Sequence, residues 1–248
     1  MQSELMKLSD VSLSYHTVAG ETIAIQDLDL TVYEGEFLAI VGPSGCGKTT
    51  VLSLIMGLLS PTAGSVRFSR EDLRLGYMLQ RDHLLDHLTV EKNVLLGLEV
   101  QHRLTEESKA HALHLLDKYG LGDFKSHKPQ QLSGGMRQKV ALIRTLALDP
   151  DLLLLDEPFS ALDYQTRLNL SDEVYRIIRS EHKSAILVTH DISEAVSMAD
   201  RVAVFSARPA KLKELIGIGF PAGMPPLERR SQPAFHDYFD RIWKELRP

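Results

Sequence analysis

The sequence predicts an α/β domain in which helices cover a parallel β-sheet, with an antiparallel β layer beside the sheet and an α-helical segment inserted into it. Short apolar runs that end in glycine or polar residues predict buried strands in FLAIVG (37–42), DLLLLDEP (151–158) and SAILVTHD (184–191). A helical pattern follows each of the first two strands, at 49–59 and at 164–182. Strands that alternate with helices in this way typically form a parallel sheet with helices on its faces.

The helix after the first predicted strand is indicated by apolar residues at helical spacing in TTVLSLIMGLL (49–59). These residues are Val51, Leu52, Ile55, Leu58 and Leu59. The turn-forming segment SPTAG (60–64) follows and ends the helix. The first unit of the fold is therefore predicted as strand, loop and helix.

Residues 84–146 contain helical patterns and no convincing strand, which predicts a helical insertion. Thr105 is a predicted N-cap, Glu106 and Glu107 favour the first helical turn, and Gly120 marks the end of that helix. Its predicted apolar face consists of Ala112, Leu115, Leu116 and Tyr119.

Residues 1–34 and 65–79 alternate between apolar and polar side chains, which predicts the antiparallel layer. The tail segment QPAFHDYFDRIWKEL (232–246) places its aromatic and aliphatic residues on one helical face, so we expect a helix that packs on its own domain. The expected organisation is one domain of 248 residues, divided into an α/β core (1–84 and 147–220), a helical subdomain (85–146) and a C-terminal helical tail (221–248).

Composition excludes several classes of protein. An apolar fraction of 44% with 25% charged residues is typical of a globular chain, and a net charge of −5 argues against a nucleic-acid partner. The single cysteine, Cys46, excludes an internal disulfide and a cysteine-rich zinc site. The N-terminal segment MQSELMKLSD has no apolar core, so no secretory signal is expected. The apolar stretches are far shorter than the roughly 20 residues that span a bilayer, so any membrane function would need a separate spanning subunit.

The segment GPSGCGKTT (42–50) matches the phosphate-binding pattern G-x-x-x-x-G-K-[ST] between a predicted strand and a predicted helix. Its glycines let backbone N–H groups surround phosphate oxygens at a helix N-terminus. We expect Lys48 to reach the β- and γ-phosphates and the Thr49 hydroxyl to bind Mg²⁺, which predicts a site for ATP or GTP. The expected nucleotide-binding residues of this loop are Gly42, Pro43, Ser44, Gly45, Cys46, Gly47, Lys48, Thr49 and Thr50. A chance match is the alternative, but the position of the segment between a predicted strand and a predicted helix favours a true phosphate-binding loop.

Polar residues at other predicted strand ends supply the remaining parts of a phosphoryl-transfer site. Asp156 is placed to hold Mg²⁺, and Glu157 to polarise an attacking water. His190 and Gln80 also end apolar strands, so we expect them near the γ-phosphate or the water. Tyr15 could stack on adenine, or it could be a half-buried core tyrosine. Asp156 and Glu157 could instead be a solvated strand end, and His190 could instead be a structural residue.

A second glycine-rich segment, QLSGGMRQK (131–139), opens a predicted helix. Ser133, Gly134 and Gly135 would present a hydroxyl and backbone donors at a helix N-terminus, which suits an anion. An ordinary N-cap is the alternative.

Six features occur in one order along the chain: GPSGCGKTT (42–50), Gln80, LSGGMRQKV (132–140), LLLLDEP (152–158), SALD (160–163) and His190. Together they resemble the ATP-binding subunit of an ATP-binding cassette (ABC) transporter over nearly the whole chain. The resemblance implies a RecA-like P-loop NTPase core. It also implies family roles for Tyr15 (adenine stacking), 42–50 (Walker A), Gln80 (Q-loop, with a part in Mg²⁺ binding), 132–136 (signature), 152–157 (Walker B), Asp163 (D-loop, at the nucleotide) and His190 (switch histidine).

The resemblance further implies that two such subunits close head to tail on two ATP molecules, with the Ser133 segment of one covering the phosphates of the other. The expected partners are a second copy, membrane-spanning permease subunits and, indirectly, a solute-binding protein. The expected location is the cytoplasmic face of the inner membrane. The phosphate loop, the signature and the tail resemble importers of nitrate, sulfonates and taurine. An exporter or lipid-trafficking cassette and a soluble cassette protein acting on DNA or ribosomes are the alternatives.

Overall fold

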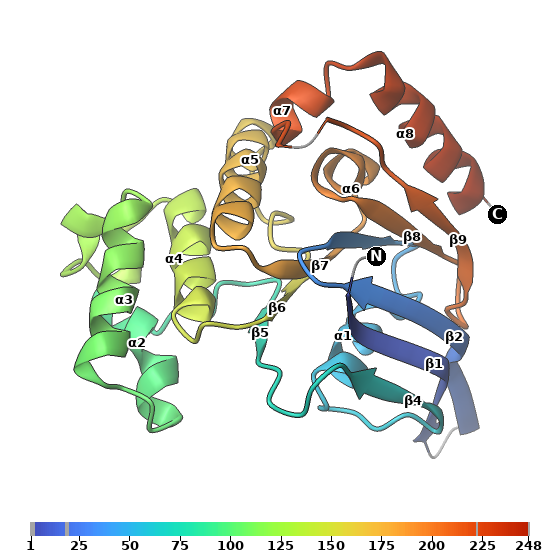
Figure 1. Cartoon of the computed structure of the whole chain (residues 1–248), viewed down its shortest axis with the longest axis horizontal. Coiled ribbons are helices and arrows are strands. Elements are labelled where there is room, and N and C mark those ends of the chain that lie inside the picture. Colours follow the sequence, from blue (N-terminus) through green and yellow to red (C-terminus); the bar gives the residue numbers. More distant parts are fainter. Residues whose placement is uncertain (1–2, 18–19, 222, 248) are drawn as a thin grey trace.

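A computed structural model describes residues 3–17, 20–221 and 223–247, and within these ranges the chain forms two β-sheets with helices between and around them (Figure 1). The larger sheet has the strand order β5-β6-β7-β3-β8-β9. All neighbouring pairs are parallel except β8 and β9. The bounds are β3 Phe37–Val41, β5 Leu75–Met78, β6 Leu152–Asp156, β7 Ser184–Thr189, β8 Arg201–Phe205 and β9 Leu212–Gly217. The predicted parallel sheet and its three strands are confirmed.

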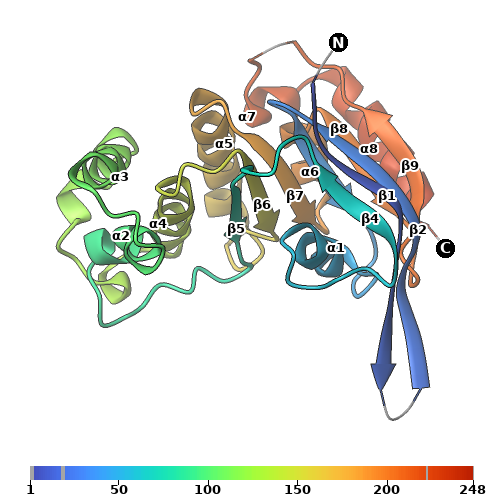
Figure 2. The same cartoon turned by 60° about the horizontal axis from the view of Figure 1, so that its bottom comes forward.

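The smaller sheet is antiparallel, with the order β2-β1-β4. It consists of β1 Glu4–Thr17, β2 Gly20–Tyr33 and β4 Ala63–Phe68, and β1 and β2 extend beyond the rest of the molecule as a long pair (Figure 2). The prediction for 65–79 is therefore only partly right. Residues 75–78 form β5, which pairs in parallel with β6 instead of joining the antiparallel layer.

The helix α1 (Lys48–Ile55) lies between the two sheets, whereas α5 (Tyr164–Ser180) and α6 (Ile192–Met198) cover the opposite face of the larger sheet. The central strand β3 is buried throughout and alternates its side chains between two cores. Leu38 and Ile40 pack toward α1, and Phe37, Ala39 and Val41 pack toward α5 and α6. This sandwich fixes the carboxyl end of β3, where the phosphate loop begins.

The first helix is shorter than predicted. It ends at Ile55, Gly57 adopts a positive φ of 73°, and Leu58 is 65% exposed. Leu58 and Leu59 therefore belong to the turn that follows the helix, because a residue in the left-handed region stops helical propagation.

Residues 90–146 form α2 (Val90–Val100), α3 (Glu106–Lys118), two 3₁₀ turns (Gly122–Phe124 and Pro129–Gln131) and α4 (Gly134–Leu146), grouped at one end of the molecule (Figure 1). The Thr105 side chain accepts a hydrogen bond from the Ser108 N–H, and the Ser108 side chain accepts one from the Thr105 N–H in return, which is a capping box. Ala112, Leu115 and Leu116 are buried as predicted.

The chain ends in α7 (Pro226–Arg229) and α8 (Pro233–Leu246). α8 packs on α6 and β8 through the buried Phe235 and Ile242, which agrees with the expected packing of this helix on its own domain. Trp243 lies at the edge of that face. It is 47% exposed and stacks on Phe239 with 6.5 Å between ring centroids.

Candidate functional site

The phosphate loop runs from the end of β3 to the start of α1. Gly47 has a φ of 125°, and a Cβ there would lie 3.1 Å from the Ala24 carbonyl oxygen, so a larger residue would be strained and crowded. Gly47 is also the N-cap of α1, and no side chain caps the helix there. The first N–H groups of α1 are therefore free to bind an anion, and the helix dipole favours negative charge at this point.

The loop borders a cavity of about 210 Å³. Its lining residues are Ser44, Gly45, Gly47, Lys48, Thr49, Thr50, Glu157 and Arg208. Lys48 is buried, and its Nζ donates to the carbonyl oxygens of Gly42 (2.8 Å) and Pro43 (3.1 Å). The structure thus gathers most of the predicted loop residues around one small polar cavity.

Three of the predicted loop residues, Gly42, Pro43 and Cys46, do not line this cavity. Cys46 differs from the others because its side chain faces the core. The residue is 1% exposed and packs with the cluster under the antiparallel sheet, and its sulfur would lie 2.9 Å from a Cβ on Gly42. Burial raises the pKa of the Cys46 thiol. Any contact between Cys46 and a nucleotide would have to come from its backbone.

Thr49 and Asp156 are in direct contact. The Thr49 hydroxyl donates to Asp156 Oδ1 at 3.1 Å, and the Tyr77 hydroxyl donates to Oδ2 at 3.2 Å. Burial raises the pKa of Asp156, and the neighbouring Glu157 carboxylate raises it further, whereas the hydrogen bonds from Thr49 and Tyr77 oppose the shift. A hydroxyl and a carboxylate side by side are hard oxygen donors, and this set fits Mg²⁺, which usually takes one or two protein oxygens together with phosphate and water oxygens.

Glu157 follows β6 directly and adopts a positive φ of 45°, which is uncommon for a residue with a side chain. Its N–H donates to the Val188 carbonyl oxygen at 2.8 Å, which fixes this conformation. Glu157 Oε2 lies 3.0 Å from His190 Nδ1 and 3.5 Å from Gln80 Nε2. The structure therefore brings the three predicted strand-end side chains together at the carboxyl ends of β5, β6 and β7.

Tyr15 lies on β1 and is 39% exposed, so it is a surface residue and not a core tyrosine. Its hydroxyl is 3.5 Å from the Thr50 hydroxyl at the start of α1. An aromatic ring thus stands beside the phosphate loop, where a base could stack on it.

The second glycine-rich segment is built as predicted but contributes nothing to the cavity at the phosphate loop. Ser133 caps α4 by accepting from the Met136 N–H at 3.3 Å. A Cβ on Gly134 would lie 3.2 Å from Leu162, and one on Gly135 would lie 3.1 Å from Thr166. The segment therefore packs against the start of α5, where Asp163 caps the helix by accepting from the Thr166 N–H at 3.0 Å.

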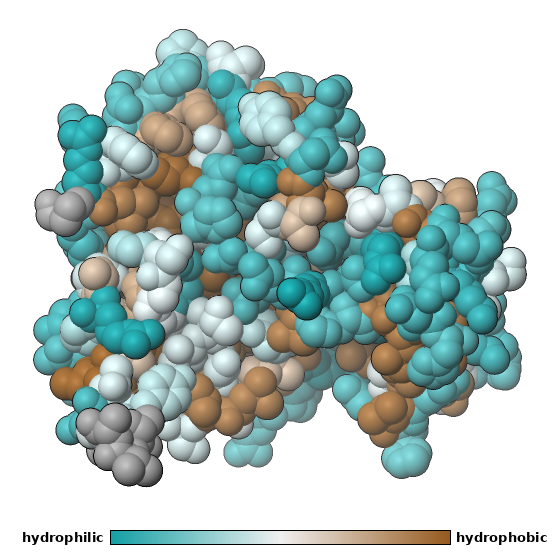
Figure 3. Space-filling model, turned by 180° about the vertical axis from the view of Figure 1, so that it is seen from behind, coloured by the Kyte–Doolittle hydropathy of each residue, from teal (hydrophilic) through white to brown (hydrophobic). Residues whose placement is uncertain are grey.

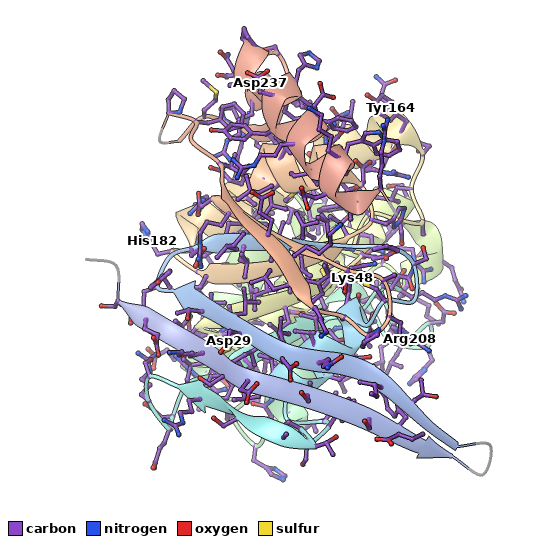
Figure 4. The ribbon with its side chains drawn as sticks, turned by 90° about the vertical axis from the view of Figure 1, so that its right-hand side faces the viewer. Asp29, Lys48, Tyr164, His182, Arg208 and Asp237 are labelled. Carbon is purple, nitrogen blue, oxygen red and sulfur yellow. The ribbon has the colours of Figure 1, made fainter. Side chains whose placement is uncertain are left out.

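Tyr77 contacts Asp156 and Arg208 lines the cavity of the candidate site, but sequence patterns do not single out either residue. Arg208 Nη2 donates to the Gly45 carbonyl oxygen at 2.9 Å, and Arg208 and Lys48 line the same cavity (Figure 4). The loop that contains Arg208 and Ala210 is hydrogen-bonded to β2. The Gln26 N–H donates to the Ala210 carbonyl oxygen at 3.0 Å, and the Ala210 N–H donates to the Ala24 carbonyl oxygen at 2.9 Å. An arginine in a loop has no local signal, because its position depends on this packing.

No helix in the described part of the chain is long and apolar enough to cross a membrane.

Comparisons with known proteins agree with this geometry. Residues 25–160 match the family model described as "ABC transporter". The chain is 46% identical over 247 residues to YtlC, an uncharacterized ABC transporter ATP-binding protein of Bacillus subtilis (strain 168), with 97% of this chain and 95% of YtlC covered. It is 39% identical over 221 residues to the taurine import ATP-binding protein TauB of Yersinia pestis bv. Antiqua (strain Antiqua), with 86% and 87% covered.

The fold is also similar to that of a solved protein, the ATP-binding cassette MJ0796, in a dimeric post-hydrolysis state bound to ADP and Pi. The TM-score is 0.72 and the identity 31%, and the match covers 87% of this chain and all of the MJ0796 chain. The P-loop NTPase fold, with its parallel and antiparallel sheets, is thus confirmed. This chain belongs to the ABC transporter family, and it is one of that family's ATP-binding, ATP-hydrolysing subunits.

Proposed function

We propose that this ATPase is the motor of an importer for a small solute of the nitrate, sulfonate or taurine class. ATP binding and hydrolysis would drive permease subunits between two access states, and a solute-binding protein would deliver the solute. The similarity to TauB over 86% of the chain supports this substrate class. The sequence of the tail segment QPAFHDYFDRIWKEL (232–246) also resembles that of these importers.

The observation that carries the proposed mechanism is the separation of the two anion-binding elements within one chain. Lys48 and Thr49 line the cavity at the phosphate loop, whereas Ser133, Gly134 and Gly135 do not. A second copy related by twofold symmetry would place its Ser133 segment over the phosphates held by the first. The dimeric state of the similar MJ0796 supports this head-to-tail homodimer. Asp163, at the start of the helix beside Gly134 and Gly135, would lie at the same interface.

Within this dimer, the loop residues Gly42–Thr50 would hold the nucleotide, with Lys48 at the β- and γ-phosphates and Tyr15 at the adenine. Thr49 and Asp156 would hold Mg²⁺, with Gln80 as an additional contact. The ion supplies charge neutralisation at the phosphates. Arg208 adds a second cation at the mouth of the loop.

Glu157 is the residue best placed to take up a proton from an attacking water. Its carboxylate faces the cavity, and His190 and Gln80 fix its orientation from the neighbouring strand ends. Phosphoryl transfer depends mainly on positioning and on charge stabilisation, so a carboxylate held by two neighbours suits this role.

The helical region at 85–146 is proposed as a subdomain that contacts a cytoplasmic helix of each permease subunit. It projects from the rest of the molecule and carries exposed apolar side chains (Figure 3). Leu85, Val100 and Leu104 are among the exposed apolar residues of this region. The ATPase would then lie at the cytoplasmic face of the inner membrane as a peripheral subunit, with the core at 1–84 and 147–220 and the tail at 221–248.

Affinity purification of the tagged chain from detergent-solubilised membranes of its own cells tests this function. We expect a permease to be recovered, with ATPase activity that rises when the solute-binding protein and its solute are added. Strong association with nucleic acid and none with a membrane protein would contradict the proposal.

A further inference from the structure

A cavity of about 620 Å³ lies between α5 and the C-terminal tail, apart from the nucleotide site. Its walls come from α5, from the segment around the end of β9, and from α7, which lies beside α5 (Figure 1). No residue of the phosphate loop lines it. Its volume lies within the range of roughly 300–1,000 Å³ typical of small-molecule sites.

Positive charge dominates the lining of this cavity. Three arginines, Arg176, Arg179 and Arg229, line it together with a single carboxylate, Asp200, although the whole chain has a net charge of −5. Arg179 Nη2 is paired with Asp200 Oδ1 at 2.6 Å. Arg176 Nη2 is paired with Asp172 Oδ2 at 2.8 Å, but its side chain is mostly exposed and can turn toward an occupant.

Arg229 is a buried cation whose nearest partners carry no formal charge. The residue is 4% exposed, and its guanidinium donates to the carbonyl oxygens of Met224 (2.9 Å) and Ala199 (3.1 Å) and to the Tyr175 hydroxyl (2.7 Å). In the described part of the chain, no carboxylate lies within ion-pair distance of Arg229, and Asp200 is paired directly with Arg179. Burial lowers the pKa of Arg229, and the more distant Asp200 charge only opposes this shift. A buried charge without a directly paired counter-charge is unfavourable, and a nearby anion would relieve it.

Two aromatic rings, those of Tyr175 and Phe220, form part of the walls. The ring centroid of Tyr175 lies 5.2 Å from Arg179 Cζ and 5.0 Å from Arg229 Cζ. The ring centroid of Phe220 lies 5.4 Å from Arg229 Cζ. Ile218 adds an aliphatic surface. An inorganic ion would leave these surfaces in contact with water, whereas an organic anion with a flat apolar body would cover them.

We propose that this cavity binds a small organic anion in which a carboxylate or sulfonate is attached to a flat, apolar body. The acidic group would lie near Arg176 and Arg229, and the body would lie against Phe220 and Ile218. Because the walls come from α5 and from the tail, an occupant would hold the tail against α5, whose N-cap is Asp163.

The test is isothermal titration of the full chain with 2-naphthoate and with 2-naphthalenesulfonate, at saturating ADP so that the nucleotide site is filled. We expect both anions to bind once per chain and the neutral 2-naphthamide to bind at least about tenfold more weakly, as the loss of a charge-assisted contact implies. Preference for one acid over the other would identify which acidic group the site favours.

Arg176→Gln is the first variant, because its exposed side chain can be replaced without opening the core. We expect it to weaken binding of both anions about tenfold. Arg241→Gln is the matched control, because Arg241 is an exposed arginine of α8 that pairs with Glu214 outside the cavity.

Phe220→Leu tests the aromatic wall of the cavity. This variant should bind both naphthyl anions more weakly, and its melting temperature should stay within a few degrees of that of the parent chain. Equal affinity of the amide and the acids, unchanged binding in Arg176→Gln, or no binding would each overturn the proposal.

Discussion

His190 Nδ1 lies 3.0 Å from Glu157 Oε2, and the two residues directly follow the neighbouring strands β7 and β6. Gln80, from the end of β5, approaches the same carboxylate oxygen and also contacts the Ser160 hydroxyl at 3.3 Å. Neighbouring parallel strands end at one edge of the sheet, so residues far apart in sequence converge on one carboxylate. This convergence is the structural basis for assigning the water-activating role to Glu157.

Glu157→Gln should bind ATP normally and hydrolyse it about 10²–10⁴-fold more slowly, which is the range expected for loss of a general base. The amide keeps the shape of the side chain and can still contact His190, so the fold and the nucleotide site should remain intact. Phosphate release and nucleotide affinity should be measured on the same preparation. With ATP, size-exclusion chromatography should show a stable dimer.

Glu71→Gln is the control for this variant, because Glu71 is exposed and lies outside the site. It should behave like the parent chain in all three measurements. Unchanged turnover in Glu157→Gln would remove Glu157 from the proposed role.

Ser133→Arg should lower the rate of ATP hydrolysis by at least about 10²-fold, which is the effect of losing a donor that stabilises the transferred phosphate. ATP binding to the monomer should stay nearly unchanged. Ser133 does not line the chain's own nucleotide cavity, so the effect requires a second chain. Combined with Glu157→Gln, the substitution should prevent the ATP-dependent dimer. Gln101→Arg, an exposed charge addition at the end of α2, is the control. Loss of ATP affinity in the Ser133→Arg monomer would mean that Ser133 acts within its own chain.

Arg208→Ala should weaken ATP binding about tenfold, the effect of losing one charge-assisted contact. Arg208 lines the cavity and donates to the Gly45 carbonyl oxygen, so it both adds positive charge and fixes the loop. Arg208→Lys separates these effects, because lysine keeps the charge without the planar donor set. Partial recovery by lysine would indicate a charge effect. If the alanine variant binds ATP as tightly as the parent chain, Arg208 only borders the site.

The parts of the site that follow a local pattern could be predicted from sequence, and the parts that depend on tertiary packing could not. Glu157 and His190 directly follow apolar runs, and the loop at 42–50 is contiguous, so their positions were predictable. Arg208 is brought to Gly45 by the docking of its loop on β2, and Tyr77 reaches Asp156 across two adjacent strands. No pattern within either segment encodes these contacts.

The wrong assignments in the fold also have physical causes. β5 is the edge strand of the parallel sheet, so its side chains alternate between buried and half-buried positions. That alternation resembles the pattern of an antiparallel strand with one solvated face, so the sequence pattern predicts the wrong sheet for 75–78. The apolar spacing through Leu58 and Leu59 predicts a longer helix, but α1 ends at Ile55 and the positive φ of Gly57 prevents its continuation.

Cys46 should resist alkylation by a bulky maleimide in the native chain, with or without ATP, and react at once in denaturant. Its side chain is 1% exposed, and burial raises the pKa of the thiol, so little reactive thiolate is present near neutral pH. Mass spectrometry after timed labelling measures the modified fraction. Rapid labelling of the native chain that ATP suppresses would instead place the sulfur at the nucleotide.

The free energy of unfolding should depend on pH through Glu194, a buried residue of α6. Burial raises the pKa of Glu194 from 4.5 to about 7, the Asp191 charge contributes to the increase, and the Thr189 hydroxyl, Arg167 and Arg230 oppose it. Between these two pH values the folded chain keeps a proton that the unfolded chain releases. The contribution of Glu194 to the free energy of unfolding should therefore be greatest below about pH 4.5. It should fall by up to about 3 kcal/mol as the pH rises to about 7.

Glu194→Gln isolates this contribution, because the amide oxygen can still accept the Thr189 hydroxyl, which donates to Glu194 Oε2 at 2.6 Å. Urea unfolding at pH 5, 6 and 8 should show the variant gaining stability over the parent chain as the pH rises, with little difference at pH 5. Glu71→Gln should run parallel to the parent chain throughout. A constant difference between Glu194→Gln and the parent across this range would mean that Glu194 is already ionised in the folded chain at pH 5. In that case Arg167 and Arg230 would outweigh the effect of burial.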